Sequence, residues 1–262
     1  MTKARKWISG PSRFLKTGFQ GLLAVYVLTA CVSSGIISSD SIAAKADTQW
    51  NSILENAPQV QDAQITNAVR QLTGNLLLAA GEDPAEWQVA VFDAPETFNA
   101  FALPNKRIGI FTGLLSTVEN ADQLAAVIGH EIAHVQLRHV EARLNRAVAP
   151  NILIGVAKLP GALSGVPVLE TTGNVVGSVV SAGTVLPYDR NQEIEADTAG
   201  ITYAFDAGFD PHQAAILWRH VEEATKAAGT STPEFLSTHP SNSRRINALE
   251  KKARELSGEP AQ

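Results

Sequence analysis

Val127-Ile128-Gly129-His130-Glu131-Ile132-Ala133-His134 is the stretch of sequence around which this chain is organised. It contains the pattern H-E-x-x-H within an apolar run that suits a helix. Helical spacing places His130 and His134 one turn apart on one face, so both imidazoles can reach a single ion. Glu131 lies beside that face, where a carboxylate can accept a proton from water at the metal. The pattern predicts a catalytic metal site, and the alternative is a surface helix with two histidines by accident.

The flanking residues indicate a helix with a close neighbour. Asn120 followed by Gln123 resembles a capping box, so we expect the helix to begin there. Gly129 disfavours a helix interior, and its presence suggests that another backbone approaches just before His130. An apolar stripe at helical spacing predicts that the helix is largely buried: Leu124, Val127, Ile128 and Ile132.

The first thirty residues are typical of a secretory signal and are not expected to join the fold. Five basic residues and no acidic residue precede a short apolar run, Leu22 to Ala30, which is too short for a comfortable membrane span. The run ends in Leu28-Thr29-Ala30-Cys31, which resembles a bacterial lipoprotein lipobox. This resemblance implies cleavage before Cys31 and attachment of lipid to it. The alternatives are an uncleaved anchor or an ordinary signal peptide.

Lipid on Cys31 would hold the protein at a membrane, because several acyl chains on one residue bind a bilayer firmly. Val32 rather than aspartate would follow the lipidated residue. By the sorting rule for enteric lipoproteins, this favours the periplasmic side of the outer membrane. Cys31 is the only cysteine, so the chain forms no intramolecular disulfide.

The charge argues against nucleic acid as a partner. The formal net charge is −5, and loss of the basic leader would leave about −10. No basic patch interleaved with aromatic residues offsets this acidity, so no nucleic-acid partner is expected.

The remaining chain is expected to form one α+β domain behind a tether. We assign residues 31–48, which are rich in serine, to the tether and residues 49–255 to the domain. Residues 256–262 are expected to be a disordered tail. Residues 150–187, rich in glycine and apolar side chains, suggest either a loop over the active-site cleft or apolar packing against the metal-binding helix.

Three short strands are predicted before the metal-binding helix, over residues 87–92, 97–103 and 107–112, and together suggest a small antiparallel sheet. An edge strand of such a sheet can pair with an extended peptide by β-augmentation. The alternative is that these strands only support the core.

A catalytic zinc site requires a third protein ligand and an open fourth position. Glu193 and Asp197 lie four residues apart on a second expected helix and share a face that Glu195 does not. One carboxylate can bind the metal while the other accepts the free ring N–H of a ligand histidine. The alternative is a solvated acidic turn at a helix start. His139, five residues after His134, is expected to be structural or exposed rather than a ligand.

Taken together, the motifs resemble the HtpX-like zinc metalloprotease family. The resemblance rests on motifs in the same order as in that family: His130-Glu131-x-x-His134, Glu193-x-x-Ala196-Asp197, Ser237-Thr238-His239-Pro240 and Arg245-Ile246. Two flanking stretches are also similar: Asn99-Ala100-Phe101-Ala102 and Ala207-Gly208-Phe209-Asp210-Pro211. The lipobox and the short C-terminus make the layout most similar to the lipoprotein members of the LoiP type.

The resemblance implies a mostly helical zincin-type fold that binds one Zn²⁺. Three residues match the family's zinc ligands: His130, His134 and Glu193. Glu131 matches the general base, and Asp197 matches the acid that orients a ligand histidine.

Further matches concern the substrate. His239 matches a histidine that either blocks the metal or polarises the substrate carbonyl, and Arg245 matches an active-site arginine. The substrate-pairing strand is matched by Asn99, Ala100 and Phe101.

The function that follows from the resemblance is that of a zinc metalloendopeptidase of the bacterial envelope. Its expected substrates are misfolded or unassembled envelope proteins. The alternative is a zinc-bound chaperone or assembly factor for outer-membrane proteins, with restrained proteolysis. A structural lipoprotein without metal is a weaker alternative.

Overall fold

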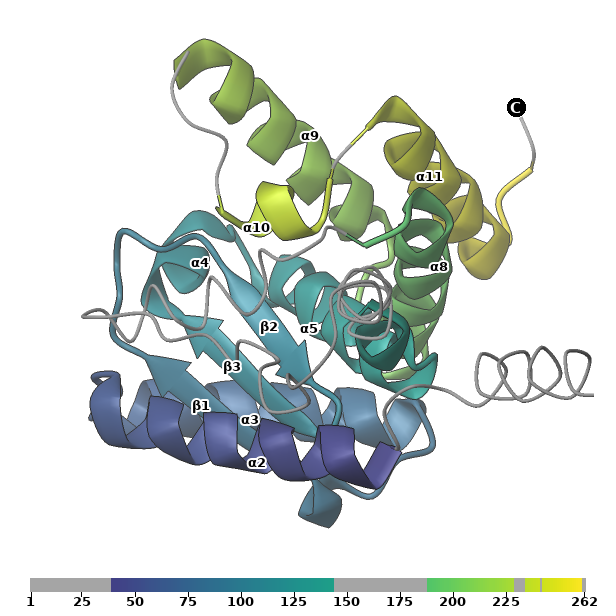
Figure 1. Cartoon of the computed structure of the whole chain (residues 1–262). Coiled ribbons are helices and arrows are strands. Elements are labelled where there is room, and N and C mark those ends of the chain that lie inside the picture. The colour runs from purple at the N-terminus through teal and green to yellow at the C-terminus, as the bar shows by residue number, and fades with distance from the viewer. Residues whose placement is uncertain (1–38, 144–187, 229–233, 241, 261–262) are drawn as a thin grey trace, which may run out of the picture. The chain divides into compact units, whose positions relative to one another are not determined.

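The computed structural model describes four stretches of the chain: residues 39–143, 188–228, 234–240 and 242–260 (Figure 1). The expected signal peptide, Cys31 and the segment over residues 150–187 lie outside these residues.

The sheet has three strands: β1 (Gln88–Phe92), β2 (Ala100–Leu103) and β3 (Arg107–Phe111). Their order in space is β1-β3-β2, so the last strand lies in the middle. β2 pairs with β3 in antiparallel fashion, whereas β1 pairs with β3 in parallel. The small sheet and the α+β class are confirmed, but the expectation that every pairing is antiparallel is wrong. Side-chain alternation along a strand determines which face each residue takes, and it does not determine which strands are neighbours.

One face of the sheet is covered by α2 (Ser39–Asn56), as Figure 1 shows. From this helix Trp50 and Ile53 pack against alternate sheet residues, Ala90, Phe92 and Phe111. The indole N–H of Trp50 also donates to the side-chain oxygen of Gln88 at 2.6 Å. This buried aromatic cluster anchors α2 to the sheet, because large rings that leave water contribute strongly to packing.

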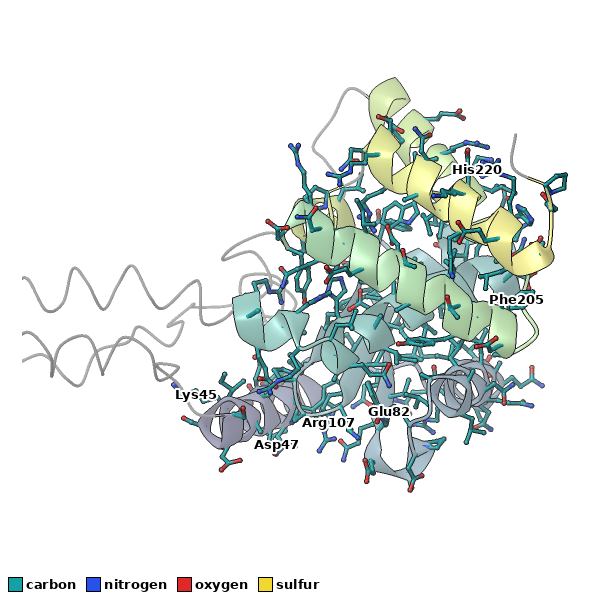
Figure 2. All side chains as sticks on the ribbon, turned by 90° about the vertical axis from the view of Figure 1, so that its right-hand side faces the viewer. Lys45, Asp47, Glu82, Arg107, Phe205 and His220 are labelled. Atoms are coloured by element: carbon teal, nitrogen blue, oxygen red, sulfur yellow. The ribbon has the colours of Figure 1, made fainter. Side chains whose placement is uncertain are left out.

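The first half of α2 corrects the expected tether. Residues 39–48 are helical, and Ile42 and Ala46 are buried at helical spacing. A carboxylate oxygen of Asp47 lies 3.2 Å from Nη2 of Arg107 on β3, and both residues are labelled in Figure 2. The serine and alanine content of this segment is compatible with a tether, but its apolar residues follow the period of a buried helix. A tether can therefore end no later than Ser39.

The other face of the sheet carries α3 (Ala63–Ala79) and α5 (Ala121–Gln136). Strand residues that point this way share one core with both helices: Val91, Ile108 and Ile110 with Leu76, Ile128 and Ile132. Two short helices lie in the connections, η1 (Pro84–Glu86) and α4 (Thr112–Thr117). The side chain of Asn120 accepts a hydrogen bond from the backbone N–H of Gln123 at 2.9 Å. The predicted start of the metal-binding helix is thus confirmed.

α5 lies directly against α8 (Arg190–Asp206), and two glycines make this contact possible. A β-carbon placed on Gly129 would lie 2.6 Å from the carbonyl oxygen of Gly200. One placed on Gly200 would lie 2.6 Å from the backbone nitrogen of His130. Both distances are shorter than unbonded atoms approach, so only glycine permits this approach. The backbone contact expected at Gly129 is confirmed, and it brings the two halves of the metal site together.

Three further helices complete the described fold: α9 (His212–Ala228), α10 (Glu234–Thr238) and α11 (Ser243–Ser257). α11 packs against α8 and α9 (Figure 1). It extends past the expected start of the disordered tail, because Gly258 takes a left-handed conformation with φ 70° and caps it. Among the residues that the structure describes, none of the helices combines the length and apolar character needed to cross a bilayer.

Candidate metal centre

Four buried side chains from separate parts of the chain converge on one point. His130 and His134 come from α5, Glu193 comes from the first turn of α8, and His239 follows α10. Their ligand atoms all lie within 4.8 Å of one another. The structure thus brings Glu193 and His239, from the two motifs later in the sequence, to the histidines of the H-E-x-x-H helix.

The geometry of the first three side chains fits a metal ion. Nε2 of His130 and Nε2 of His134 are 2.9 Å apart, and Oε1 of Glu193 lies 3.3 Å from Nε2 of His134. Lone pairs of two neutral imidazoles repel at this distance unless a cation or a proton lies between them. Two imidazoles and one carboxylate with room for a fourth group are the donor set of catalytic zinc.

The protonation states of His134 and Glu193 suit ligation as well. Burial is the largest cause that holds the pKa of His134 well below its usual value, so its imidazole is neutral. Burial alone would raise the pKa of Glu193. Interactions with the neighbouring His239 and Arg245 outweigh burial, so this pKa falls well below the usual range and the carboxylate is ionised. A neutral imidazole and an ionised carboxylate are the forms that bind metal.

Glu131 lies beside the cluster and outside its ligand set. The side chain is buried, and Oε1 finds no hydrogen-bond donor among the described residues. This oxygen lies 3.4 Å from Nε2 of His239. Burial raises the pKa of Glu131, because a carboxylate without strong donors is poorly stabilised as an anion.

Asp197 orients the first histidine. Its Oδ1 lies 2.9 Å from Nδ1 of His130, although away from the direction of a linear N–H···O bond. Arg245 donates to both oxygens of Asp197, from Nε at 2.7 Å and from Nη2 at 2.8 Å. Burial alone would raise the pKa of Asp197, but this arginine lowers it, so the carboxylate stays ionised.

Arg245 is buried, and its guanidinium is surrounded by hydrogen-bond acceptors of the protein. Besides Asp197 it reaches Oε2 of Glu193 at 2.5 Å. Its Nη1 donates to the carbonyl oxygens of His239 and Pro240, each at 3.2 Å. The guanidinium thus ties the metal cluster to the segment that carries His239.

His239 is held against the ligands by stacking. Nδ1 lies 3.1 Å from Nε2 of His130 and 3.1 Å from Oε1 of Glu193. Phe235 stacks on the ring with centroids 4.5 Å apart, and Tyr188 lies across it at 5.1 Å. The ring therefore occupies a place from which it can reach a metal held by the other three side chains.

The Asn99–Phe101 stretch lies close to this cluster. Asn99 is buried, and Ala100 and Phe101 begin β2, which is an edge strand that packs against α5. The preceding Phe98 meets the ring of Phe235 edge-on at 5.8 Å, and Phe235 stacks on His239. The segment that leads into this edge strand is thus linked to His239 through two aromatic rings, those of Phe98 and Phe235.

Two nearby residues were not identified as site residues from the sequence. The ring of Tyr188 stacks on His134 at 3.8 Å, and the guanidinium of Arg143 lies over Tyr188 at 4.1 Å. His139, which was expected to be structural or exposed, is buried and faces His134. For Tyr188 the only signal is its place immediately before Asp189, the N-cap of α8.

Comparison with known proteins identifies relatives of this chain. Residues 60–253 match the model of a family described as "Peptidase family M48". Mitochondrial metalloendopeptidase OMA1 of Schizosaccharomyces pombe is 32% identical over 184 residues, which cover 70% of this chain and 51% of that protein. The putative beta-barrel assembly-enhancing protease of Vibrio cholerae is 26% identical over 227 residues, which cover 86% and 46%.

A third relative is the beta-barrel assembly-enhancing protease of Yersinia pestis, which is 24% identical over 253 residues. The matched region covers 92% of this chain and 50% of that protein. This chain therefore spans about half the length of these curated relatives.

Proposed function

This chain belongs to peptidase family M48, and we propose that it is a zinc metalloendopeptidase that cleaves misfolded or unassembled proteins of the bacterial cell envelope. The observation that carries the peptidase activity is the buried set of His130, His134 and Glu193 with Glu131 beside it, whose Oε1 accepts no hydrogen bond from the described residues. The substrate class is supported by the lipobox at Cys31 and by the similarity to two bacterial proteins named as beta-barrel assembly-enhancing proteases.

The proposed mechanism assigns each step to a residue of the site. The three ligands would hold zinc, which supplies Lewis-acid activation of water and of the peptide carbonyl. Glu131 accepts the proton of the attacking water. Because the pKa of Glu131 is raised, the carboxyl group holds this proton more readily than an ordinary glutamate and can then release it to the leaving amine.

Substrate is proposed to bind along β2. An extended peptide can add to the free edge of this strand at Asn99, Ala100 and Phe101, as in other cases of β-augmentation. The edge lies near His239 through the Phe98–Phe235 contact, so an added strand would run past the metal.

Arg245 is assigned a positioning role in place of direct contact with the substrate. The hydrogen bonds that it donates to described residues end on Asp197 and on the carbonyls of His239 and Pro240. A guanidinium engaged in this way keeps the carboxylates ionised and the histidine segment in place.

His239→Ala is expected to raise the rate of cleavage. The ring lies 3.1 Å from atoms of two ligands, and at that place it competes with water and substrate for the metal. The measurement is the initial rate of cleavage of an unfolded client by variant and wild type at equal zinc content. A fall of about 10²–10³-fold would instead assign His239 to carbonyl polarisation. An unchanged rate would place the ring away from the metal during turnover.

The envelope location is proposed to depend on a lipid anchor at Cys31, as in the lipoprotein members of the LoiP type. In bacterial cells fed a clickable fatty acid, the wild-type chain should take up label and fractionate with the outer membrane. Cys31→Ala should carry no label and leave the membrane fraction, because the acylated residue is gone. Ser33→Ala is the matched control and should be labelled as wild type.

In the same cells the lifetime of an unassembled outer-membrane β-barrel protein reports the substrate class. The wild-type chain should shorten this lifetime. Equal labelling of the Cys31→Ala variant would refute the anchor. An unchanged client lifetime with a labelled wild type would refute the substrate class alone.

A further inference from the structure

We propose that His139 is a positioning residue for zinc, which holds His134 in the tautomer and ring orientation that the metal needs. It does so by accepting the Nδ1–H of His134, while Glu195 orients His139 in turn. The inference rests on the zinc site of the proposed function. It concerns metal binding only, so it can be tested without a substrate.

The backbone explains how His139 returns to the site. α5 ends at Gln136, and Arg138 takes a left-handed conformation with φ 57°. The chain turns there, and a helical segment resumes at His139. The imidazole of His139 is 4% exposed and faces His134, with Nδ1 to Nδ1 at 3.2 Å. On its other side, Nε2 of His139 lies 3.2 Å from Oε2 of Glu195.

His134, His139 and Glu195 form a row of hydrogen-bonded side chains. The position of each proton in this row follows from the role of His134 as a metal ligand. Nε2 of His134 is the atom that faces Glu193 and His130, so it must keep its lone pair for the metal. The ring proton of His134 is therefore on Nδ1, which can only donate. Nδ1 of His139 must then accept, and the proton of His139 is on Nε2.

The outer end of the row agrees with this assignment. Nε2–H of His139 points to Glu195, and an ionised carboxylate can only accept. Each of the two links thus has one donor and one acceptor. Reversing either link would put a proton on the nitrogen of His134 that the metal requires.

The two histidine ligands therefore have different supports. His130 faces Asp197, a buried carboxylate that Arg245 holds from two nitrogens. His134 faces a neutral imidazole whose own partner, Glu195, is largely exposed, with 63% of its side-chain surface accessible. Outer partners of metal-binding histidines fix the tautomer and contribute to affinity. The structure shows no other partner for Nδ1 of His134 among the residues that it describes.

The experiment is a zinc titration of the folded protein against a chromophoric chelator, without substrate. His139→Leu removes the acceptor and keeps apolar volume, so the dissociation constant for zinc should rise by about 10–100-fold. His139→Asn places its side-chain oxygen near the position of Nδ1 and should restore most of the affinity. His220→Leu, at an exposed histidine on α9 labelled in Figure 2, is the matched control and should bind zinc as wild type.

Melting of the metal-free proteins separates positioning from packing. If His139 acts through the ligand, the Asn variant keeps both the melting temperature and most of the zinc affinity. A His139→Leu protein that binds zinc as tightly as wild type would overturn the proposal. So would an Asn variant as weak as a folded Leu variant, or, if Leu does not fold, an Asn variant about 100-fold weaker than wild type.

The proposed peptidase function can fail independently. A wild-type protein that binds zinc but cuts no client would contradict that function and leave the His139 result standing. A wild-type protein that binds no zinc would overturn both.

Discussion

Glu193→Ala is expected to abolish tight zinc binding, whereas Glu195→Ala retains most of it. Glu193 supplies one of three ligands, and its oxygens lie 3.3 Å and 3.7 Å from the histidine nitrogens. Loss of a ligand should cost more than the roughly 100-fold upper limit for loss of an outer partner. Among the described residues, the hydrogen bond or ion pair of Glu195 is the one to His139, and its side chain is largely exposed, so its effect should be much smaller.

The same comparison needs a variant that keeps the buried volume. Alanine at position 193 leaves Arg245 with one fewer buried carboxylate, and an uncompensated buried charge costs stability. Glu193→Gln keeps the volume and an acceptor for Arg245, but a neutral amide binds zinc poorly. The measurement is zinc per chain by elemental analysis, with melting of each metal-free protein as the test of folding. Equal zinc content in the Glu193 and Glu195 variants would refute the ligand assignment.

Much of the metal site could be predicted from the sequence, because local rules determine it. Helical spacing places His130 and His134 on one face, and the same rule pairs Glu193 with Asp197. Gly129 correctly indicated a close backbone contact, which the structure places at Gly200. The start of α5 at Asn120 follows from capping chemistry alone.

Other features depend on contacts between distant segments. The parallel pairing of β1 with β3 reflects strand order in space, which no local pattern encodes. In a continuous helix, His139, five residues after His134, would lie on a different face from that ligand. Arg138 takes a left-handed conformation and interrupts the helix, and nothing at this position in the sequence predicts that interruption. Helical periodicity therefore cannot predict the environment of a residue that follows such a turn.

At the two ends of the domain, the sequence contains a signal for each boundary, but the local composition suggests a different one. Serine and alanine suggested a tether through residue 48, yet Ile42, Ala46 and Trp50 already follow helical spacing. At the other end, Gly258 is a common C-terminal cap and marks the true end of α11. Weighing the apolar spacing and the cap before the composition would have placed both ends closer to those observed.

Glu131→Gln is expected to remove nearly all proteolysis and to leave zinc binding intact. The side chain is not a ligand, and its buried Oε1 lacks a donor among the described residues. Glutamine keeps the size of the side chain but cannot accept a proton from water. A positioned general base contributes about 10²–10⁴-fold to a rate, so the loss should fall in that range. Glu55→Gln, at an exposed glutamate on α2, is the matched control.

The most direct measurement is the appearance of new amino termini in an unfolded outer-membrane protein, for wild type and Glu131→Gln at the same zinc content. If the buried site is that of a peptidase, wild type produces new internal termini. The variant binds the client and produces them about 10²–10⁴-fold more slowly. Zinc-loaded wild type that binds the client and yields no new termini would contradict the peptidase and favour a chaperone. Equal cleavage by both proteins would show that Glu131 is not the base.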